Sequence, residues 1–77
     1  MKTDYLVIGR CGMDDVPLRL CSPRRAARVY ALTVSEDQIT DAGMEVMGVG
    51  LSMVCNVSIL PFRNGKPGKA EVIKEFD

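Results

Sequence analysis

Three arginines near the start of a predicted helix carry the most obvious binding chemistry of the chain. Arg24, Arg25 and Arg28 lie within the segment CSPRRAARVYA and could contact a phosphate backbone. Nucleic-acid-binding domains usually combine such bases with stacking aromatic side chains and a basic overall charge. This chain has a formal net charge of zero and only two tyrosines and two phenylalanines. The bases that could extend the patch are Arg10, Arg19 and Lys66.

The segment that follows these arginines is acidic and could balance them. Residues 31–62 contain no lysine or arginine. Their acids are Glu36, Asp37, Asp41 and Glu45. Segments of opposite charge can satisfy each other within one fold. We therefore interpret the three arginines first as a solvated or ion-paired helix face, and nucleic-acid contact through them as the alternative.

The residue types give catalysis and metal binding little support. The chain has no histidine, so Ser–His and Cys–His pairs are excluded within one copy. Cys11, Cys21 and Cys55 are odd in number and lack C-x-x-C spacing, which argues against a disulfide framework and a zinc site. Whether Cys11, which follows Arg10, is reactive stays open at this point. We expect no enzymatic activity, no catalytic residue, no cofactor and no metal ion.

Length and composition favour one compact domain over residues 1–77. Hydrophobic residues make up 47% of the chain, which is enough for a packed core and too many for a disordered segment. The N-terminus does not resemble a signal peptide, and no apolar run is long enough to cross a bilayer. Because unpaired thiols are typical of a reducing compartment, we expect a cytoplasmic protein without membrane contact.

The first part of the chain predicts two strands that form a hairpin. Residues 5–8 are β-branched and aromatic-rich, and Gly9 and Gly12 are expected to end this strand. Residues 16–21 alternate between apolar and other residues, which is typical of a strand with one buried face. Pro17 cannot donate to a ladder of hydrogen bonds, so this second strand is expected at a sheet edge.

The middle of the chain predicts one helix and leaves a second one open. Ser22 and Pro23 are expected as the N-cap and the first helical residue. The apolar stripe of this helix is Ala27, Tyr30, Ala31 and Val34. Ser35 and Gln38 have the spacing of a capping box for a second helix. Its apolar face would be Ile39, Ala42, Gly43, Val46 and Met47. Because Gly43 disfavours a helix, whether residues 35–47 are helical throughout stays open.

Two more strands are predicted at the end of the chain. Residues 53–62 and 69–76 read as strands, and between them Asn64–Gly65 is the dipeptide favoured by a type I′ turn. The order is strand, strand, helix, optional second helix, strand, strand. We therefore predict an α+β fold: a four-stranded antiparallel sheet with one or two helices packed on one face.

The last two predicted strands are apolar on both sides, which indicates an interaction surface. Val54, Leu60 and Phe62 alternate with the expected core residues, and Ile73 lies between two glutamates on the outward side of the last strand. We therefore expect a small non-catalytic protein-interaction or regulatory module that binds a protein partner or self-associates as a homodimer through this hairpin.

Overall fold

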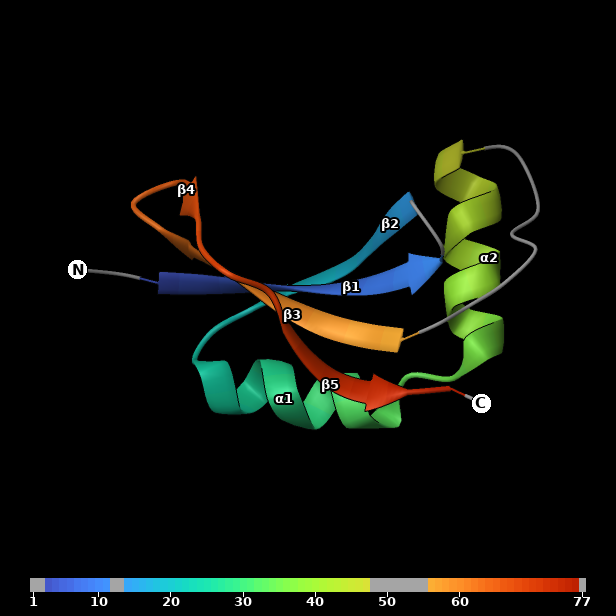
Figure 1. The fold of residues 1–77 in the computed structure, drawn as a ribbon, viewed down its shortest axis with the longest axis horizontal. Helices are drawn as coiled ribbons and strands as arrows, with labels where there is room; N and C mark the ends of the chain where they lie inside the picture. Colours follow the sequence, from blue (N-terminus) through green and yellow to red (C-terminus); the bar gives the residue numbers. More distant parts are fainter. Residues whose placement is uncertain (1–2, 12–13, 48–55, 77) are drawn as a thin grey trace.

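The computed structural model describes residues 3–11, 14–47 and 56–76, which form one antiparallel sheet and two helices. The elements are β1 (Thr3–Cys11), β2 (Asp14–Cys21), α1 (Arg24–Thr33), α2 (Glu36–Met47), β3 (Asn56–Arg63), β4 (Lys66–Pro67) and β5 (Glu71–Glu75). Helix α1 runs along the sheet, and α2 stands across the end of the first hairpin (Figure 1). The predicted α+β fold and the order of its elements are confirmed.

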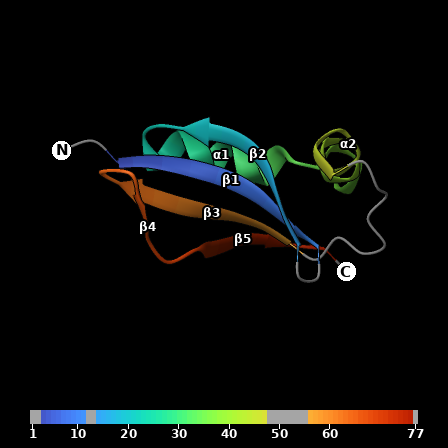
Figure 2. The same ribbon diagram turned by 90° about the horizontal axis from the view of Figure 1, so that it is seen from above.

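The strands are arranged so that the two hairpins meet through their first strands. The order across the sheet is β2-β1-β3, and both β4 and β5 pair with β3 on its other side. Figure 2 shows this order, from β2 beside α1 to β5 on the far side. Strand β2 therefore has a strand partner on one side only within the described residues, as Pro17 predicts.

Strand β1 continues past Gly9, where the sequence indicates an end. The glycine lies under the side chain of Ile39: a Cβ atom at position 9 would be 2.5 Å from Ile39 Cγ2. Gly9 therefore serves the close approach of α2 to the sheet and does not end the strand. The other predicted strand end, Gly12, lies outside the described residues.

A β-bulge changes which side chains of β2 face the core. The pairing of β2 with β1 shifts register at Leu18. Val16 is buried and Leu18 packs against the core, as the alternation predicts, but Leu20 is 60% exposed. Beyond the bulge Arg19 lies over the ring of Tyr30, on the side of α1. The prediction of one continuous buried face is therefore wrong for Leu20.

Helix α1 begins one residue later than predicted. Pro23 is the N-cap, in an extended conformation with φ −76° and ψ −175°, and no side chain caps the helix. The carbonyl oxygen of Pro23 accepts the N–H groups of Ala26 and Ala27 at 3.0 and 3.3 Å. Because Pro23 is extended, Ser22 precedes the cap, and its predicted capping role is wrong.

The other end of α1 is held by a side chain from β5. Lys74 Nζ donates to the carbonyl oxygens of Leu32 and Val34 at 3.2 and 2.7 Å. A lysine in this position satisfies carbonyls that have no partner within the helix and complements the negative end of its dipole. The predicted apolar stripe of α1 is confirmed, since Ala27, Ala31 and Val34 are fully buried and Tyr30 packs against them.

Helix α2 forms with the predicted capping box. Gln38 Oε1 accepts the N–H of Ser35 at 2.8 Å, and Ser35 Oγ accepts the N–H of Gln38 at 3.3 Å. The helix runs through Gly43 to Met47, which settles the open question of its length. Ile39 at its start is fully buried and joins the core.

The predicted turn at Asn64–Gly65 is confirmed, but the last strand is divided. Both residues have positive φ, 54° and 79°, as a type I′ turn requires. The short β4 follows, and the N–H of Gly68 donates to the Pro61 carbonyl at 2.7 Å. The chain then returns to pair with β3 as β5, next to Ile59.

Candidate functional site

An apolar row crosses the sheet on the side opposite α1. Val7 and Ile59 face the core, so the alternating residues Leu6 and Leu60 point the other way. Leu6 pairs with Leu20 on β2 and with Leu60 on β3. We call this side the outer sheet face; its apolar residues are Leu6, Ile8, Leu20, Leu60, Phe62 and Val72, of which Ile8 is buried. Leu60 and Phe62 are half-buried there, while the predicted Val54 lies outside the described residues.

The outward position predicted for Ile73 is wrong. Ile73 packs against the core, and Glu71 on the same side forms an ion pair with Arg24 of α1. The alternation of Glu71 and Ile73 is thus as predicted, but the face is inverted. The physical reason is that β5 lies beside Arg24 of α1. A glutamate on this side of the strand can face the helix, pair with Arg24 and remain exposed to water. Val72 is the outward residue, 47% exposed.

The three arginines of α1 do not form one common site. Arg24 pairs with Glu71 on the side of β5, whereas Arg25 lies beside a groove on the side of β2. Arg28 is exposed. Within the described ranges no ion pair links these arginines to the acids of α2, so the predicted pairing with that segment is wrong. The reason is that α2 stands at the end of the sheet, away from the N-terminal turn of α1 (Figure 1).

A groove lies between β2 and α1, with a volume of about 750 Å³. We call it the β2–α1 groove. The residues that line it include Arg19, Leu20, Cys21, Arg25, Val29 and Tyr30. Strand β2 ends at Cys21 and α1 begins at Arg24, so the edge strand and the helix diverge from Ser22. The groove lies between them. Leu20 and Val29, 60% and 58% exposed, are the large apolar side chains at its rim, and Leu20 also belongs to the outer sheet face.

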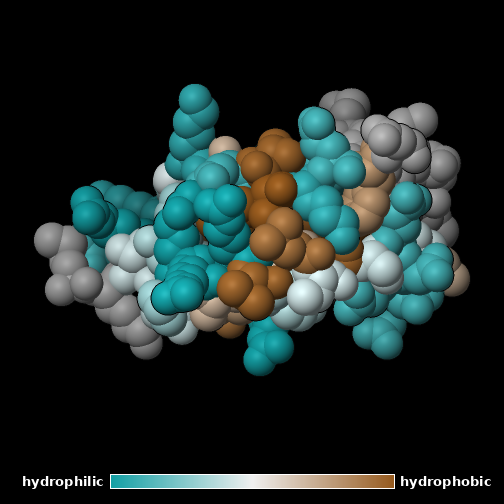
Figure 3. Space-filling model, turned by 90° about the horizontal axis from the view of Figure 1, so that it is seen from below, coloured by the Kyte–Doolittle hydropathy of each residue, from teal (hydrophilic) through white to brown (hydrophobic). Residues whose placement is uncertain are grey.

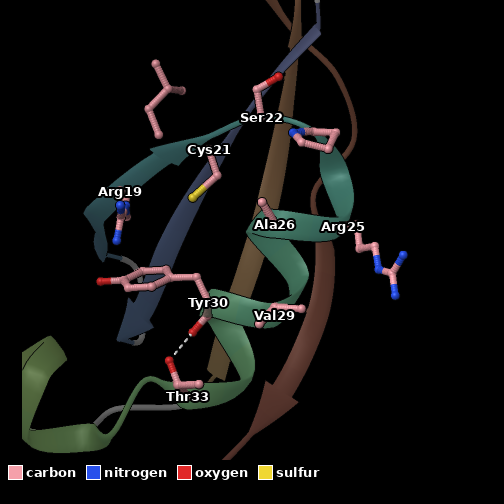
Figure 4. A pocket seen from close by; sticks show the side chains of 10 residues that line it. Arg19, Cys21, Ser22, Arg25, Ala26, Val29, Tyr30 and Thr33 are labelled. Atoms are coloured by element: carbon pink, nitrogen blue, oxygen red, sulfur yellow. Dashed lines mark hydrogen bonds between the residues drawn. The ribbon is translucent and has the colours of Figure 1, made fainter.

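The polar part of this groove is cationic. The guanidinium carbon of Arg19 lies 5.3 Å from the centroid of the Tyr30 ring, a cation–π contact. Figure 4 shows Tyr30 and Cys21 directed into the space between β2 and α1, with Arg25 on the outer side of the helix. None of the described residues that line the groove is an aspartate or a glutamate.

The two cysteines in the described ranges lie in different surroundings. Cys11 is 6% exposed and belongs to the core, whereas the thiol of Cys21 lies at the β2–α1 groove. No cluster of three metal-ligating side chains occurs in the ranges that the structure describes. In the same ranges, neither helix is long and apolar enough to cross a membrane.

The sequence indicates the arginines of this groove only in part. The sequence places Arg19 and Arg25 in a wider candidate patch that also includes Arg10, Arg24, Arg28 and Lys66. Lys66 instead lines a separate groove of about 590 Å³ at the end of the β3–β4 hairpin. The signal that could have located the β2–α1 groove is Pro17, which marks β2 as an edge strand shortly before a helix.

The candidate surfaces are inferred from the structure of this chain alone. In comparison with known proteins, no family model, no curated protein and no solved structure matches the chain.

Proposed function

We propose that this protein is a small, non-catalytic, cytoplasmic protein-interaction module that binds its partner in the β2–α1 groove. The observation that carries the proposal is the edge of β2 beside that groove, which has no strand partner among the described residues. An unpaired strand edge offers backbone donors and acceptors to another chain. The exposed side chains of Leu20 and Val29 add apolar area next to this edge, as at the centre of protein interfaces.

A protein partner suits this groove better than a nucleic acid. The Tyr30 ring, which could stack on a base, is covered by Arg19. Arg24 is engaged by Glu71, so the helix does not present its three arginines together. The chain as a whole is neutral, which provides no general attraction for a polyanion. We therefore treat nucleic-acid binding as the alternative to a protein partner.

Peptide selection tests the proposal. We expect a phage-displayed random peptide library to yield peptides that bind the wild type. The double variant Leu20→Asp/Val29→Asp should weaken their binding by about tenfold or more, since charges replace the apolar part of the groove. Met44→Asp/Val72→Asp is the matched control, because both residues are exposed and neither lines the groove. Equal loss in both double variants, or no enriched peptide, would contradict the proposal.

Self-association through the outer sheet face is a second candidate, favoured by the leucine row across β2, β1 and β3. On this face β1 also presents Asp4 and Arg10, at either end of Leu6 and Ile8. A two-fold arrangement that stacks two such faces antiparallel would bring Asp4 of one copy opposite Arg10 of the other. Arg10 also pairs with Asp15 of its own copy, so Asp4 of the second copy would join this ion pair, and the apolar rows would face each other.

Light scattering at increasing protein concentration decides this second candidate. It predicts the mass of a dimer for the wild type and of a monomer for Leu60→Asp. Val29→Asp should remain dimeric, because Val29 lies on α1 and not on the outer sheet face. A wild type that stays monomeric at every concentration excludes self-association and leaves the groove proposal intact.

A further inference from the structure

The available edge of β2 is its C-terminal half. Pro17 has no N–H group and cannot donate to an added strand, which blunts the edge near the hairpin tip. Residues 19–21 lie beyond both Pro17 and the bulge at Leu18, and the β2–α1 groove is lined by these same residues. Backbone pairing and side-chain contacts would therefore occur in one place. This combination is that of domains that bind extended peptides by adding them as a strand.

The charge of the groove selects the kind of peptide. Arg19 and Arg25 contribute to its lining, and no acid does. The two acids of β2, Asp14 and Asp15, lie on the other side of Pro17, and Asp15 bonds Arg10 at 3.1 Å. The C-terminal half of β2 thus presents positive charge without an acidic neighbour in the groove. An extended segment that carries carboxylates complements it.

Arg19 is held in a position that suits a carboxylate. Its guanidinium lies over the Tyr30 ring, and a cation–π contact restricts the side chain without using the N–H groups. A guanidinium held in this way can form two parallel bonds to one carboxylate with less loss of side-chain freedom. Arg25, on the outer side of α1, adds a second positive charge at the rim of the groove (Figure 4).

The exposed hydrophobic residues accommodate the alternate side chains of the same segment. Side chains of an extended peptide point to opposite sides in turn, so carboxylates at the arginines leave apolar neighbours for a second set of contacts. On the side away from α1 these neighbours meet Leu20, which is 60% exposed, and on the side of α1 the 58% exposed Val29 lies beside the arginines. Figure 3 shows hydrophobic side chains gathered in the middle of the molecule when it is seen from below, with hydrophilic ones on both sides.

We infer that the β2–α1 groove binds an extended acidic peptide segment, which adds to the outer edge of β2 in the described sheet and places its carboxylates near Arg19 and Arg25. This inference rests on the proposed interaction function and names its partner chemistry. The favoured ligand alternates acidic residues with β-branched ones.

The probe for this inference is a short synthetic peptide in which glutamate alternates with valine. Its affinity is measured by fluorescence anisotropy, and its site by amide shifts of the labelled protein. We expect shifts at residues 18–22 and on the groove side of α1. Arg19→Gln and Arg25→Gln should each weaken binding about tenfold, because each removes a charge-assisted contact. Arg28→Gln is the matched control on the same helix and should leave the affinity unchanged.

Two modified peptides separate the parts of the inference. Lysine in place of every glutamate should abolish binding; equal affinity would overturn the acidic selectivity and leave peptide binding standing. N-methylation of alternate backbone nitrogens should weaken binding strongly, since it removes donors to the β2 edge; equal affinity would overturn strand addition.

The remaining outcomes distinguish this inference from the proposed function. If the acidic peptide does not bind but library-selected peptides of other composition shift residues 18–22, the inference fails and the interaction function stands. If neither binds and a mixed oligonucleotide shifts Arg19 and Arg25, both fail in favour of nucleic-acid binding.

Discussion

Gly9→Ala is expected to destabilise the protein by about 1–3 kcal/mol, the range for overpacking of a core. The added Cβ would lie 2.5 Å from Cγ2, 2.9 Å from Cγ1 and 3.0 Å from Cδ1 of Ile39. These distances are far below contact distance for two carbon atoms. Ile39 is fully buried, so its side chain cannot swing into solvent to relieve the contact. The strain therefore has to move α2 away from the sheet.

A double-mutant cycle in urea identifies Ile39 as the cause. Ile39→Ala removes all three contacting atoms, so adding Gly9→Ala to that variant should change the free energy of unfolding little. Ile39→Val is the control, because valine keeps both Cγ atoms and should not relieve the contact. An additive cycle with Ile39→Ala would show that α2 does not approach Gly9 in this way.

Ile59→Ala is expected to cost about 2–5 kcal/mol of unfolding free energy, as for a fully buried isoleucine. Ile59 is 1% exposed and belongs to the core cluster under α1. The next residue, Leu60, points to the outer sheet face and is half-buried. Leu60→Ala should therefore cost clearly less, although it removes a side chain of similar size.

This pair tests which side of β3 carries the core. Urea unfolding of both variants gives the comparison, and the two residues control for each other because they are neighbours in one strand. If Leu60→Ala costs as much as Ile59→Ala, the outer sheet face is a second buried surface. That result would strengthen self-association in the folded protein, and a greater loss for Leu60→Ala would contradict the assigned face.

Local chemistry explains the parts of the fold that the sequence predicts correctly. The capping box of Ser35 and Gln38 and the turn at Asn64–Gly65 depend on residues that are close in the chain. The stripe of α1 depends only on helical periodicity. By contrast, Gly9 reads as a strand end because nothing near it shows that Ile39, far along the chain, will lie against it.

The candidate site was less predictable, since it depends on irregular pairing between strands. The bulge at Leu18 turns Arg19 towards Tyr30 and exposes Leu20. No residue type in β2 indicates that a bulge occurs there. Glu71 faces α1 because Arg24 is there, which a pattern within β5 alone cannot show. The arginines were visible in the sequence, but their division between the two sides of α1 follows from tertiary packing.

The most direct test of the account is an isotope-filtered nuclear Overhauser measurement on the labelled protein with the unlabelled acidic peptide. Addition of a strand to β2 predicts cross-strand contacts between backbone protons of residues 18–21 and those of the peptide, together with contacts from its side chains to Val29. Contacts confined to Leu60 and Phe62, with none at β2, would contradict the β2–α1 groove as the binding site and place the partner on the outer sheet face.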